Sequence, residues 1–480
     1  MIGPRRLLVA AFFILITASF SAASDIYIAQ NATGASSGAD CADAYSASFF
    51  NNSGNWGSGS GQIGPGVTVY LCGTVSSNLN FQSNGAAGGS GVCGALATAC
   101  TPVILDGSQS GAFMNGYINV NTSYFIIQNV TWTTNYATNS SGQAVIQMSG
   151  NWSHGTIQNN HIAVENSAQV IFMFTGNDML IQNNYLSMYS PSGDNFDTDG
   201  VDFPSVTNLT LQGNFIQLNI SEPDGCGSAS GGCHDDIIQT WQYNSNPAPA
   251  NFTVRYNYFS NISPGATGPQ NISFCMIEGT SGTNYIYGNV FYSTGVGSND
   301  DNGCGLGPGT FYVNNNTFIA QTGNGGTGLA SLMSGGGTVT AENNIFYRDS
   351  NGNSPGALLR QNQGSLTFDH NFFYSPSSGD FPSGCSGQTG DICTTSSTTA
   401  AGLFNNFAAD DFSLASGSPA IGAGVNLGSP YNEGLLQGDT WPNPTLGTRI
   451  STGAWDMGAY ESSGSGAAPS APTALKATVN

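Results

Sequence analysis

Lysine and arginine are scarce in this chain, and their scarcity limits what it can bind. The 480 residues include 7 Lys plus Arg against 28 Asp plus Glu, and Lys476 is the only lysine. The formal net charge is -21 at pH 7. Proteins bind nucleic acids and anionic membranes mainly through lysine and arginine, which neutralise phosphate. The composition therefore excludes nucleic acid as a partner, and it disfavours polyanionic glycans unless a metal ion bridges them.

Long apolar runs are missing after the first residues, so we expect no membrane span in the body of the chain. Arg5 and Arg6 precede an apolar run over 7–20, and Ser21 and Ala23 are small. This order is typical of a secretory signal peptide cleaved after Ala23. A membrane anchor is the alternative, but the apolar run is short for spanning. We expect a protein that is extracellular or periplasmic.

Charged residues make up 7% of the chain and hydrophobic residues 39%, which argues against disorder. The ten cysteines include no CxxC pair, and His234 is the only histidine beside a cysteine, so a zinc site is the weaker reading. In an oxidising compartment an even number of cysteines favours disulfides. Sequence neighbours suggest five pairs, although sequence alone leaves the connectivity open: Cys41–Cys72, Cys93–Cys100, Cys226–Cys233, Cys275–Cys304 and Cys385–Cys393.

One short motif repeats along the chain and indicates the fold. Alternating apolar residues are followed by a polar pair, an asparagine and an apolar residue, as in 156–162 and 180–186. The recurring asparagines are Asn160, Asn184, Asn214, Asn257, Asn289, Asn316, Asn344 and Asn371. Intervals of about 24 to 43 residues suit one coil of a solenoid with three short strands per coil. An antiparallel β-sandwich is the alternative, but it does not explain a fixed motif at coil-length intervals.

The recurring asparagine has two physical uses in such a coil. Asparagine tolerates a left-handed backbone at a sharp turn. Its side-chain amide can also hydrogen-bond to the equivalent asparagine one coil away, at about 4.8 Å. The fold class that we predict is all-β, a right-handed parallel β-helix solenoid with an N-terminal cap, and we expect a monomer.

The chain divides into four parts on this reading. We expect a signal peptide over 1–23, a cap and first coils over 24–110, the β-helix over 111–461, and a Ser/Gly/Ala/Pro linker with a fibronectin-like stub over 462–480. A short helix within 42–56 would plug the first coil. A solenoid needs such a cap because an open edge pairs with other chains.

The repeats, together with Asp-Ile-Tyr-Ile-Ala at 25–29 and Asp-Met-Gly-Ala-Tyr-Glu at 456–461, resemble bacterial right-handed β-helix proteins of the pectin-lyase-like superfamily. The resemblance covers about residues 25 to 461. It implies the fold, whereas proteins with this fold include lyases, hydrolases, esterases and non-enzymes. We expect a polysaccharide as the partner.

Acidic residues gather in two neighbouring coils. Aligning Asp199-Gly-Val-Asp202 with Asp236-Ile-Ile-Gln239 places Asp199 over Asp236 and Asp202 over Gln239. Continuing to the next coil, Cys275-Met-Ile-Glu278 brings Glu278 into the second row. Carboxylates stacked about 5 Å apart raise a pKa, recruit a cation or hold a water molecule. Insertions over 221–233 and 242–250 flank Asp235 and Asp236, and long loops on a regular scaffold are commonly functional.

Asp197-Thr-Asp199-Gly-Val-Asp202 and His234-Asp235-Asp236-Ile resemble two motifs of the polygalacturonase family, whose members hydrolyse glycosidic bonds with inversion. By this resemblance Asp235 is the general acid, and Asp199 and Asp236 hold the attacking water. The resemblance is partial, because Glu278-Gly279 stands where the family has His-Gly and the uronate-binding Arg-x-Lys is missing. The motifs therefore favour a carbohydrate site more than a galacturonate substrate.

Side chains around this trio complete the candidate substrate-binding set, which comprises Asp202, His234, Gln239, Trp241, Tyr243, Arg255 and Glu278. Trp241 and Tyr243 offer flat apolar faces for a sugar ring. Two other functions stay open. Asn195-x-Asp197-x-Asp199-Gly200 resembles the first half of an EF-hand loop. Calcium held by Asp197, Asp199 and Asp202 would serve a lyase with Arg255 as its base. A non-catalytic glycan-binding or adhesive solenoid is the third reading.

Overall fold

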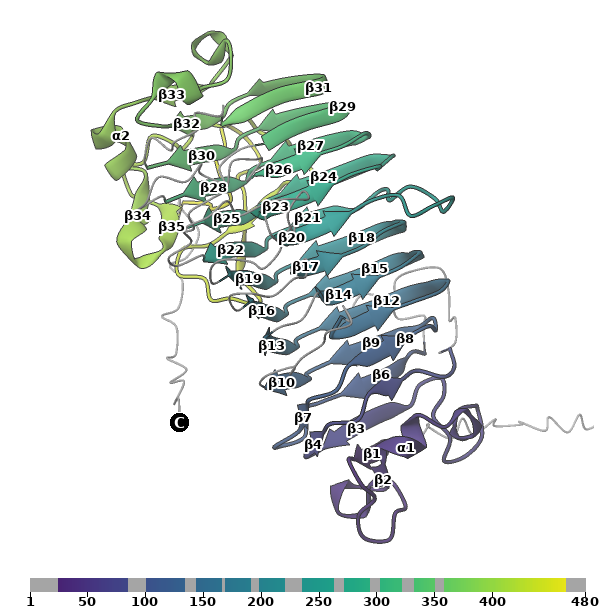
Figure 1. The fold of residues 1–480 in the computed structure, drawn as a ribbon. Helices are drawn as coiled ribbons and strands as arrows, with labels where there is room; N and C mark the ends of the chain where they lie inside the picture. Colours follow the sequence, from purple (N-terminus) through teal and green to yellow (C-terminus); the bar gives the residue numbers. More distant parts are fainter. Residues whose placement is uncertain are drawn as a thin grey trace, which may run out of the picture.

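Three strands per turn build a right-handed parallel β-helix, as the spacing of the asparagines predicts (Figure 1). The computed structural model describes residues 25–84, 101–133, 144–165, 169–190, 198–220, 235–262, 272–293, 303–321, 332–349 and 358–462. Successive coils are joined by parallel pairing, and the strands form three faces along the axis. The fold class predicted from the repeats is confirmed.

We name the faces 1, 2 and 3 in the order in which the chain passes through them. Face 1 contains β5 (Leu79–Asn80), β8 (Ile118–Val120), β11 (Ile146–Met148), β14 (Gln169–Met173), β17 (Asp199–Asp202), β20 (Asp235–Thr240), β23 (Ile272–Ile277), β26 (Cys304–Leu306) and the first residues of β29 (Leu332–Glu342) and β31 (Leu359–Asp369). The later residues of β29 and β31 continue into face 2.

The two other faces are equally regular. Face 2 contains β1 (Ile26–Ala29), β3 (Thr68–Cys72), β6 (Val103–Asp106), β9 (Phe125–Gln128), β12 (Trp152–Gln158), β15 (Gly176–Gln182), β18 (Val206–Gln212), β21 (Thr253–Arg255), β24 (Thr283–Tyr287) and β27 (Thr310–Asn314). Face 3 contains β4 (Thr74–Val75), β7 (Phe113–Met114), β10 (Thr131–Thr133), β13 (His161–Glu165), β16 (Tyr185–Ser190), β19 (Phe215–Ile220), β22 (Tyr258–Ile262), β25 (Val290–Ser293), β28 (Thr317–Ala320), β30 (Ile345–Arg348), β32 (Phe372–Tyr374) and β33 (Ile392–Thr394).

Inward side chains of successive coils stack into rows and form the core. In face 2, buried aliphatic residues such as Ile157, Ile181 and Leu211 pair in register. In face 3 a row of phenylalanine rings stacks with centroids 4.5 to 5.1 Å apart, and it contains Phe259, Phe291, Phe318, Phe346 and Phe373. Stacked aromatic and aliphatic rows bury large apolar areas and so supply most of the stabilisation.

The asparagine ladder predicted from the repeats is present between faces 2 and 3. The side-chain amide of Asn160 donates to Oδ1 of Asn184 at 3.0 Å, and the contact recurs at each coil to Asn371. The left-handed backbone that we expected at these asparagines occurs instead one residue earlier, for example at Asn159 and Asn183. The ladder amides are almost fully buried, so their role is hydrogen bonding and the preceding residue makes the turn.

Both ends of the solenoid are closed. At the start, η1 (Cys41–Asp43), β2 (Tyr45–Ser46), α1 (Ala47–Phe50) and η2 (Ser53–Asn55) form the predicted cap, in which Phe50 and Trp56 are buried. At the other end the coils finish at β33. Between β32 and β33 the chain forms two short 3-10 helices, η3 (Ser378–Asp380) and η4 (Cys385–Gly387). After β33 follow α2 (Ser397–Ala401), β34 (Phe404–Asn406), η5 (Phe407–Ala409), β35 (Asp411–Leu414), β36 (Glu433–Leu435) and β37 (Leu446–Thr448).

Residues 403–461, which we call the strap, lie against the outside of the coils instead of adding further coils. Trp441 contacts Tyr258 at 5.6 Å between ring centroids, and the Asn443 N–H donates to the Gly213 carbonyl at 2.9 Å. Arg449 is 2% exposed and donates to Glu461 and to backbone carbonyls of the strap. The last part of the predicted 111–461 repeat region is therefore a strap that covers the outer side of late coils.

Three of the five predicted disulfides join described cysteines, and these pairs are confirmed: Cys41–Cys72, Cys275–Cys304 and Cys385–Cys393. Cys93, Cys100, Cys226 and Cys233 lie outside the described residues, so their pairing stays a prediction. In the described part of the chain no helix is long and apolar enough to cross a membrane. The signal peptide over 1–23 and, apart from Ser462, the linker and stub over 462–480 also lie outside the described residues.

Candidate functional site

The strands of face 1 share a departure from simple alternation. In β14 and β23 two adjacent buried residues lie between two partly exposed ones. In β17 the residues on both sides of the equivalent pair are buried as well, and in β20 the residue before it is. Ladder pairing skips the first residue of each buried pair. At Gly200 an added Cβ would point at the core residue Ile216, 3.0 Å from its Cγ2. Asp199 and Asp202 therefore lie on the same outer side of β17, although they are three residues apart.

Two outward rows result, and they carry the acidic residues. The first row contains Gln169, Asp199, Asp236 and Ser273, and the second contains Phe172, Asp202, Gln239 and Met276. The N–H of Asp236 donates to Oδ1 of Asp199 at 2.9 Å. The predicted stacking of Asp199 on Asp236 and of Asp202 on Gln239 is confirmed.

Asp235 joins this group because it stands where β20 begins. Adjacent residues in a regular strand face opposite sides, so Asp235 and Asp236 can share a site only at such a junction. Oδ1 of Asp235 accepts the N–H of Thr198 at 2.8 Å, which ties the two coils together reciprocally. The Ser273 hydroxyl donates to Oδ1 of Asp236 from the following coil.

We call Asp199, Asp202, Asp235 and Asp236 the carboxylate cluster. Each of the four residues is 1% exposed. Burial raises the pKa of Asp199 well above its usual value, and the negative charges of Asp202, Asp236 and Asp235 raise it further. The N–H of Asp236 partly opposes this shift. The cluster is therefore built to keep a proton on Asp199 at a pH where an ordinary aspartate has lost it.

Glu278 does not enter the second row, and our alignment of its coil was wrong. Gln239 pairs with Met276, so Glu278 lies two residues beyond the row, with an exposed side chain. Its N–H donates to the Thr240 carbonyl at 2.8 Å. The predicted register was shifted by two residues because the buried pair Phe274-Cys275 corresponds to Ile237-Ile238, and Cys275 therefore aligns with Ile238 and not with Asp236.

Arg255 is likewise not brought to the carboxylate cluster. It belongs to β21 on face 2, where Nε donates to Gln212 Oε1 at 2.8 Å and Nη1 donates to the Tyr287 hydroxyl at 2.9 Å. In the register of face 2, Arg255 follows a row of glutamines, so its role there is structural. Arg255 therefore lies on a different face of the solenoid from the carboxylate cluster.

Two further candidates, Asp197 and His234, lie outside the described residues. Asp197 was one of three proposed calcium ligands with Asp199 and Asp202, and it is not placed. Among the described residues, no group of three or more His, Cys, Asp and Glu side chains is arranged to hold a metal ion. Calcium stays an expectation, and we derive no step that depends on it.

Aromatic side chains follow the second outward row toward the next turn. The Trp241 ring lies 6.5 Å from that of Phe172, and the Tyr243 ring meets the edge of Phe174 at 4.9 Å between centroids. Tyr243 is 39% exposed. Phe172, Phe174 and Ser273 were missed by our sequence reading. Their signal was positional, since Phe172 aligns with Asp202 and Ser273 with Asp236.

Comparisons with known proteins come from solved structures only. No family model matches the chain, and no curated protein matches it. A GH136 lacto-N-biosidase from Eubacterium ramulus aligns at 10% identity, with a TM-score of 0.37, over 72% of this chain and 67% of its own. The pectate lyase Pel9A aligns at 13% identity, with a TM-score of 0.31, over 91% of this chain and 96% of its own.

An alginate lyase from Paenibacillus sp. str. FPU-7 aligns at 11% identity, with a TM-score of 0.28, over 72% of this chain and 98% of its own. These likenesses concern the path of the chain and do not extend to a reaction. The parallel pairing of the coils and the ladder between faces 2 and 3 establish the architecture independently. The fold predicted from the repeats is thus confirmed: the chain is a parallel β-helix.

Proposed function

We propose that the chain is a secreted polysaccharide-active enzyme, a glycoside hydrolase that uses the carboxylate cluster. The observation that carries the proposal is the gathering of Asp199, Asp202, Asp235 and Asp236 on two neighbouring coils of face 1, where burial and mutual repulsion raise the pKa of Asp199. Glycoside hydrolysis needs one carboxyl group that holds a proton and a second that is ionised. Carboxyl groups whose environments push their pKa values apart can divide these tasks.

The resemblance to polygalacturonases gives the general acid role to Asp235. The raised pKa of Asp199 makes Asp199 a second candidate for the group that keeps the proton and donates it to the glycosidic oxygen. In that case Asp235 and Asp236, on the neighbouring coil, would accept a proton from the attacking water. Gln239 and Trp241, next along the outward surface, would orient the sugar.

A neutral or weakly acidic polysaccharide is the substrate class that this surface favours. Each uronate carboxylate needs a cationic partner, and the chain has 7 Lys plus Arg in all. Four carboxyl groups in one patch would also repel a polyanion. We therefore expect glucan, xylan, mannan or galactan chains to be better substrates than polygalacturonate.

The test is a comparison of the native protein with Asp199→Asn, Asp235→Asn and Asp236→Asn on a panel of these polysaccharides. Hydrolysis is scored as new reducing ends, and lyase action as absorbance of the unsaturated product. We expect reducing ends without that absorbance, and a loss of about 10² to 10⁴ in kcat for Asp199→Asn. Asp106→Asn is the matched control, because Asp106 is also buried but lies on face 2.

Each alternative has its own outcome in this experiment. Unsaturated product that disappears with a chelator would favour the calcium-dependent lyase. Glycan binding without any bond cleavage would favour the non-catalytic solenoid. Full activity in all three cluster variants would overturn the hydrolase proposal.

A further inference from the structure

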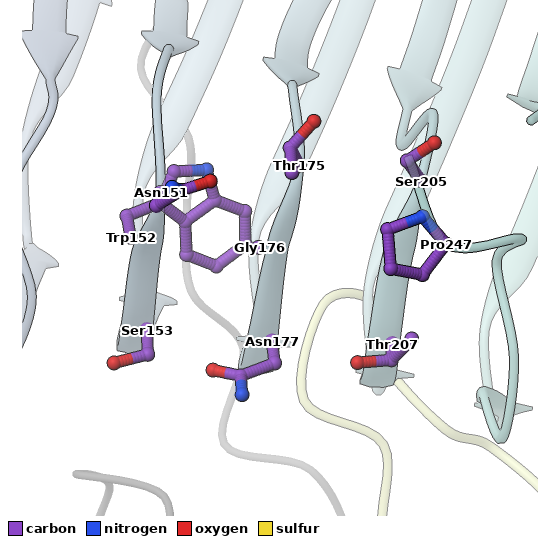
Figure 2. A pocket seen from close by; sticks show the side chains of 9 residues that line it. All are labelled: Asn151, Trp152, Ser153, Thr175, Gly176, Asn177, Ser205, Thr207 and Pro247. Atoms are coloured by element: carbon purple, nitrogen blue, oxygen red, sulfur yellow. The ribbon is translucent and has the colours of Figure 1, made fainter. Parts of the chain in front are cut away.

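A hollow on the outside of the solenoid lies close to the carboxylate cluster, at the turn from face 1 to face 2. Its volume is about 320 Å³, at the lower end of the roughly 300–1,000 Å³ typical of small-molecule sites. Figure 2 shows side chains from three neighbouring coils around it, with Pro247 at one side. The hollow was not foreseen from the sequence, although Pro247 belongs to the predicted insertion over 242–250.

Beneath the hollow the middle coil carries a glycine at an inward position, and the Trp152 indole fills the space that a side chain would take. Gly176 pairs with Trp152 on one side and with Val206 on the other. A Cβ on Gly176 would lie 2.3 Å from Cε2 of the Trp152 indole, so the ring lies directly against the glycine backbone. Trp152 Nε1 donates to the Phe174 carbonyl at 2.8 Å, which fixes the ring in this position. The floor of the hollow is therefore the Gly176 backbone, with the buried indole fixed beneath it.

The rim of the hollow carries uncharged hydrogen-bonding groups in register. Ser153, Asn177 and Thr207 occupy equivalent positions on β12, β15 and β18, and Figure 2 shows them side by side. Asn151 adds an amide group two residues before Ser153, and Ser205 adds a hydroxyl group two residues before Thr207. Neighbouring coils are about 4.8 Å apart, a spacing comparable to the width of one sugar ring. Among the lining residues none is charged.

The hollow is connected to the carboxylate cluster by the aromatic side chains of the same surface. Asp202 and Ser205 are three residues apart, which an extended chain spans in at most about 11 Å. The Tyr243 N–H donates to Ser205 Oγ at 2.9 Å, and the exposed Tyr243 ring contacts Phe174. An oligosaccharide that fills the hollow would therefore cross Tyr243 before it reaches Asp202.

We propose that this hollow is a sugar-binding subsite that holds a neutral residue of a polysaccharide chain while the chain passes over Tyr243 toward the carboxylate cluster. Uncharged amide and hydroxyl groups arranged in register match a neutral sugar, which presents hydroxyl groups at its edge. The inference rests on the proposed function for the direction of the chain, but the binding itself does not depend on catalysis.

Binding is measured directly, by calorimetry or affinity electrophoresis, with soluble xylan, galactomannan, mixed-linkage glucan and polygalacturonate as probes. We expect Asn177→Ala to weaken binding of the preferred neutral glycan about tenfold, the effect of one or two lost hydrogen bonds. Tyr243→Ala should weaken binding to a similar extent. Asn362→Ala is the matched control, because Asn362 is also an exposed asparagine on a strand of the same sheet, β31.

The outcomes separate this inference from the proposed function. Weaker binding in Asn177→Ala and Tyr243→Ala, with native binding in Asn362→Ala, supports the subsite even if Asp199→Asn leaves activity intact and the hydrolase proposal fails. Unchanged affinity in both hollow variants overturns the subsite even if the cluster proves catalytic. Failure of the native protein to bind any neutral probe, or tighter binding of polygalacturonate, also overturns it.

Discussion

Asp106 and Arg255 lie at opposite ends of one row of hydrogen-bonded glutamines on face 2. Gln128 Nε2 donates to Oδ2 of Asp106 at 2.7 Å, and three further glutamines follow, each donating to the one before at 2.8 Å. Arg255 Nε donates to Oε1, the side-chain amide oxygen, of the last glutamine, Gln212. All amide groups therefore point the same way, with an acceptor-only anion at one end and a donor-only cation at the other. Hydrogen bonds in such a chain polarise and strengthen one another.

This relationship predicts that Arg255→Met lowers stability and leaves activity unchanged. The methionine removes the donors to Gln212 Oε1 and to the Tyr287 hydroxyl. Hydrogen bonds to charged groups contribute about 1.5 to 3 kcal/mol, so we expect a loss of roughly that size in urea unfolding. Arg255→Gln, which extends the row by one amide, should lose less. A large drop in kcat with unchanged stability would instead restore Arg255 as a catalytic base.

The asparagine ladder ends on an acidic residue, and this gives a prediction for pH. Oδ1 of Asp391 accepts the Asn371 N–H at 2.7 Å. Burial raises the pKa of Asp391 from 3.8 to about 6. A raised carboxyl pKa means that the folded state binds the proton more tightly, so the contribution is present below about pH 4 and is lost as the pH rises through about 6.

Asp391→Asn should remove this dependence. The amide oxygen can still accept the Asn371 N–H, and no charge has to be buried at neutral pH. We expect a higher melting temperature than the native protein at pH 7 to 8 and a similar one below pH 4, measured by differential scanning calorimetry. Asp25→Asn, at an exposed position, is the control and should show no such crossover. A lower melting temperature for Asp391→Asn at every pH would contradict the prediction.

The carboxylate cluster should show a conflict between stability and activity. Asp199→Asn keeps the oxygen that accepts the Asp236 N–H and removes a charge that Asp202 and Asp236 repel. Because the pKa of Asp199 is raised, its contribution to stability is lost as the pH rises. We therefore expect Asp199→Asn to melt higher than the native protein at pH 7 while its kcat falls. The cluster residues are 1% exposed, so a substitution among them changes stability as well as activity.

Asp106→Asn provides the opposite sign in the same assay. Asp106 accepts amide hydrogens from Gln128 and Asn129, and an asparagine there would place an NH₂ group against a donor. We expect Asp106→Asn to melt lower at pH 7 and to keep its activity. Equal melting shifts for the Asp199 and Asp106 variants would argue against a strained, functional cluster.

The fold could be predicted from the sequence because one coil is repeated. Each asparagine such as Asn184 and Asn214 carries little information alone, but its recurrence at coil length excludes a sandwich and aligns the neighbouring coils. The same alignment places Asp199 against Asp236 and Asp202 against Gln239. In this sense the centre of the candidate site follows from periodicity alone.

Periodicity fails where the coil is irregular. Glu278 was misplaced because two adjacent buried residues in the strands of face 1 break the alternation of inward and outward side chains. The sequence alone does not show whether Cys275 aligns with Asp236 or, as the structure has it, with Ile238. The strap was missed because its contacts, such as that of Trp441 with Tyr258, join residues far apart in sequence. The hollow was missed because its lining combines residues of three coils with Pro247, which lie far apart in sequence.

The buried pair in β17 gives the last prediction, which concerns Gly200. An added Cβ at this position would lie 2.3 Å from the Ile237 carbonyl oxygen and 3.0 Å from Ile216 Cγ2. The first contact is with backbone, which has little room to yield, so β17 must shift in Gly200→Ala. Overpacking of this kind typically costs about 1 to 3 kcal/mol, and we expect a loss of that size.

We expect Gly200→Ala to lower activity more strongly than stability, because Asp199 and Asp202 lie on either side of the Gly200-Val201 pair. A displacement of about 1 Å in a catalytic group can lower a rate about 10²-fold. The variant is assayed well below its melting temperature, with circular dichroism to show that it is folded. Gly417→Ala is the control, since a Cβ there meets nothing within 4 Å. Native kcat in folded Gly200→Ala would mean that the spacing of the two aspartates does not matter for the reaction, and the cluster would then lose its claim to catalysis.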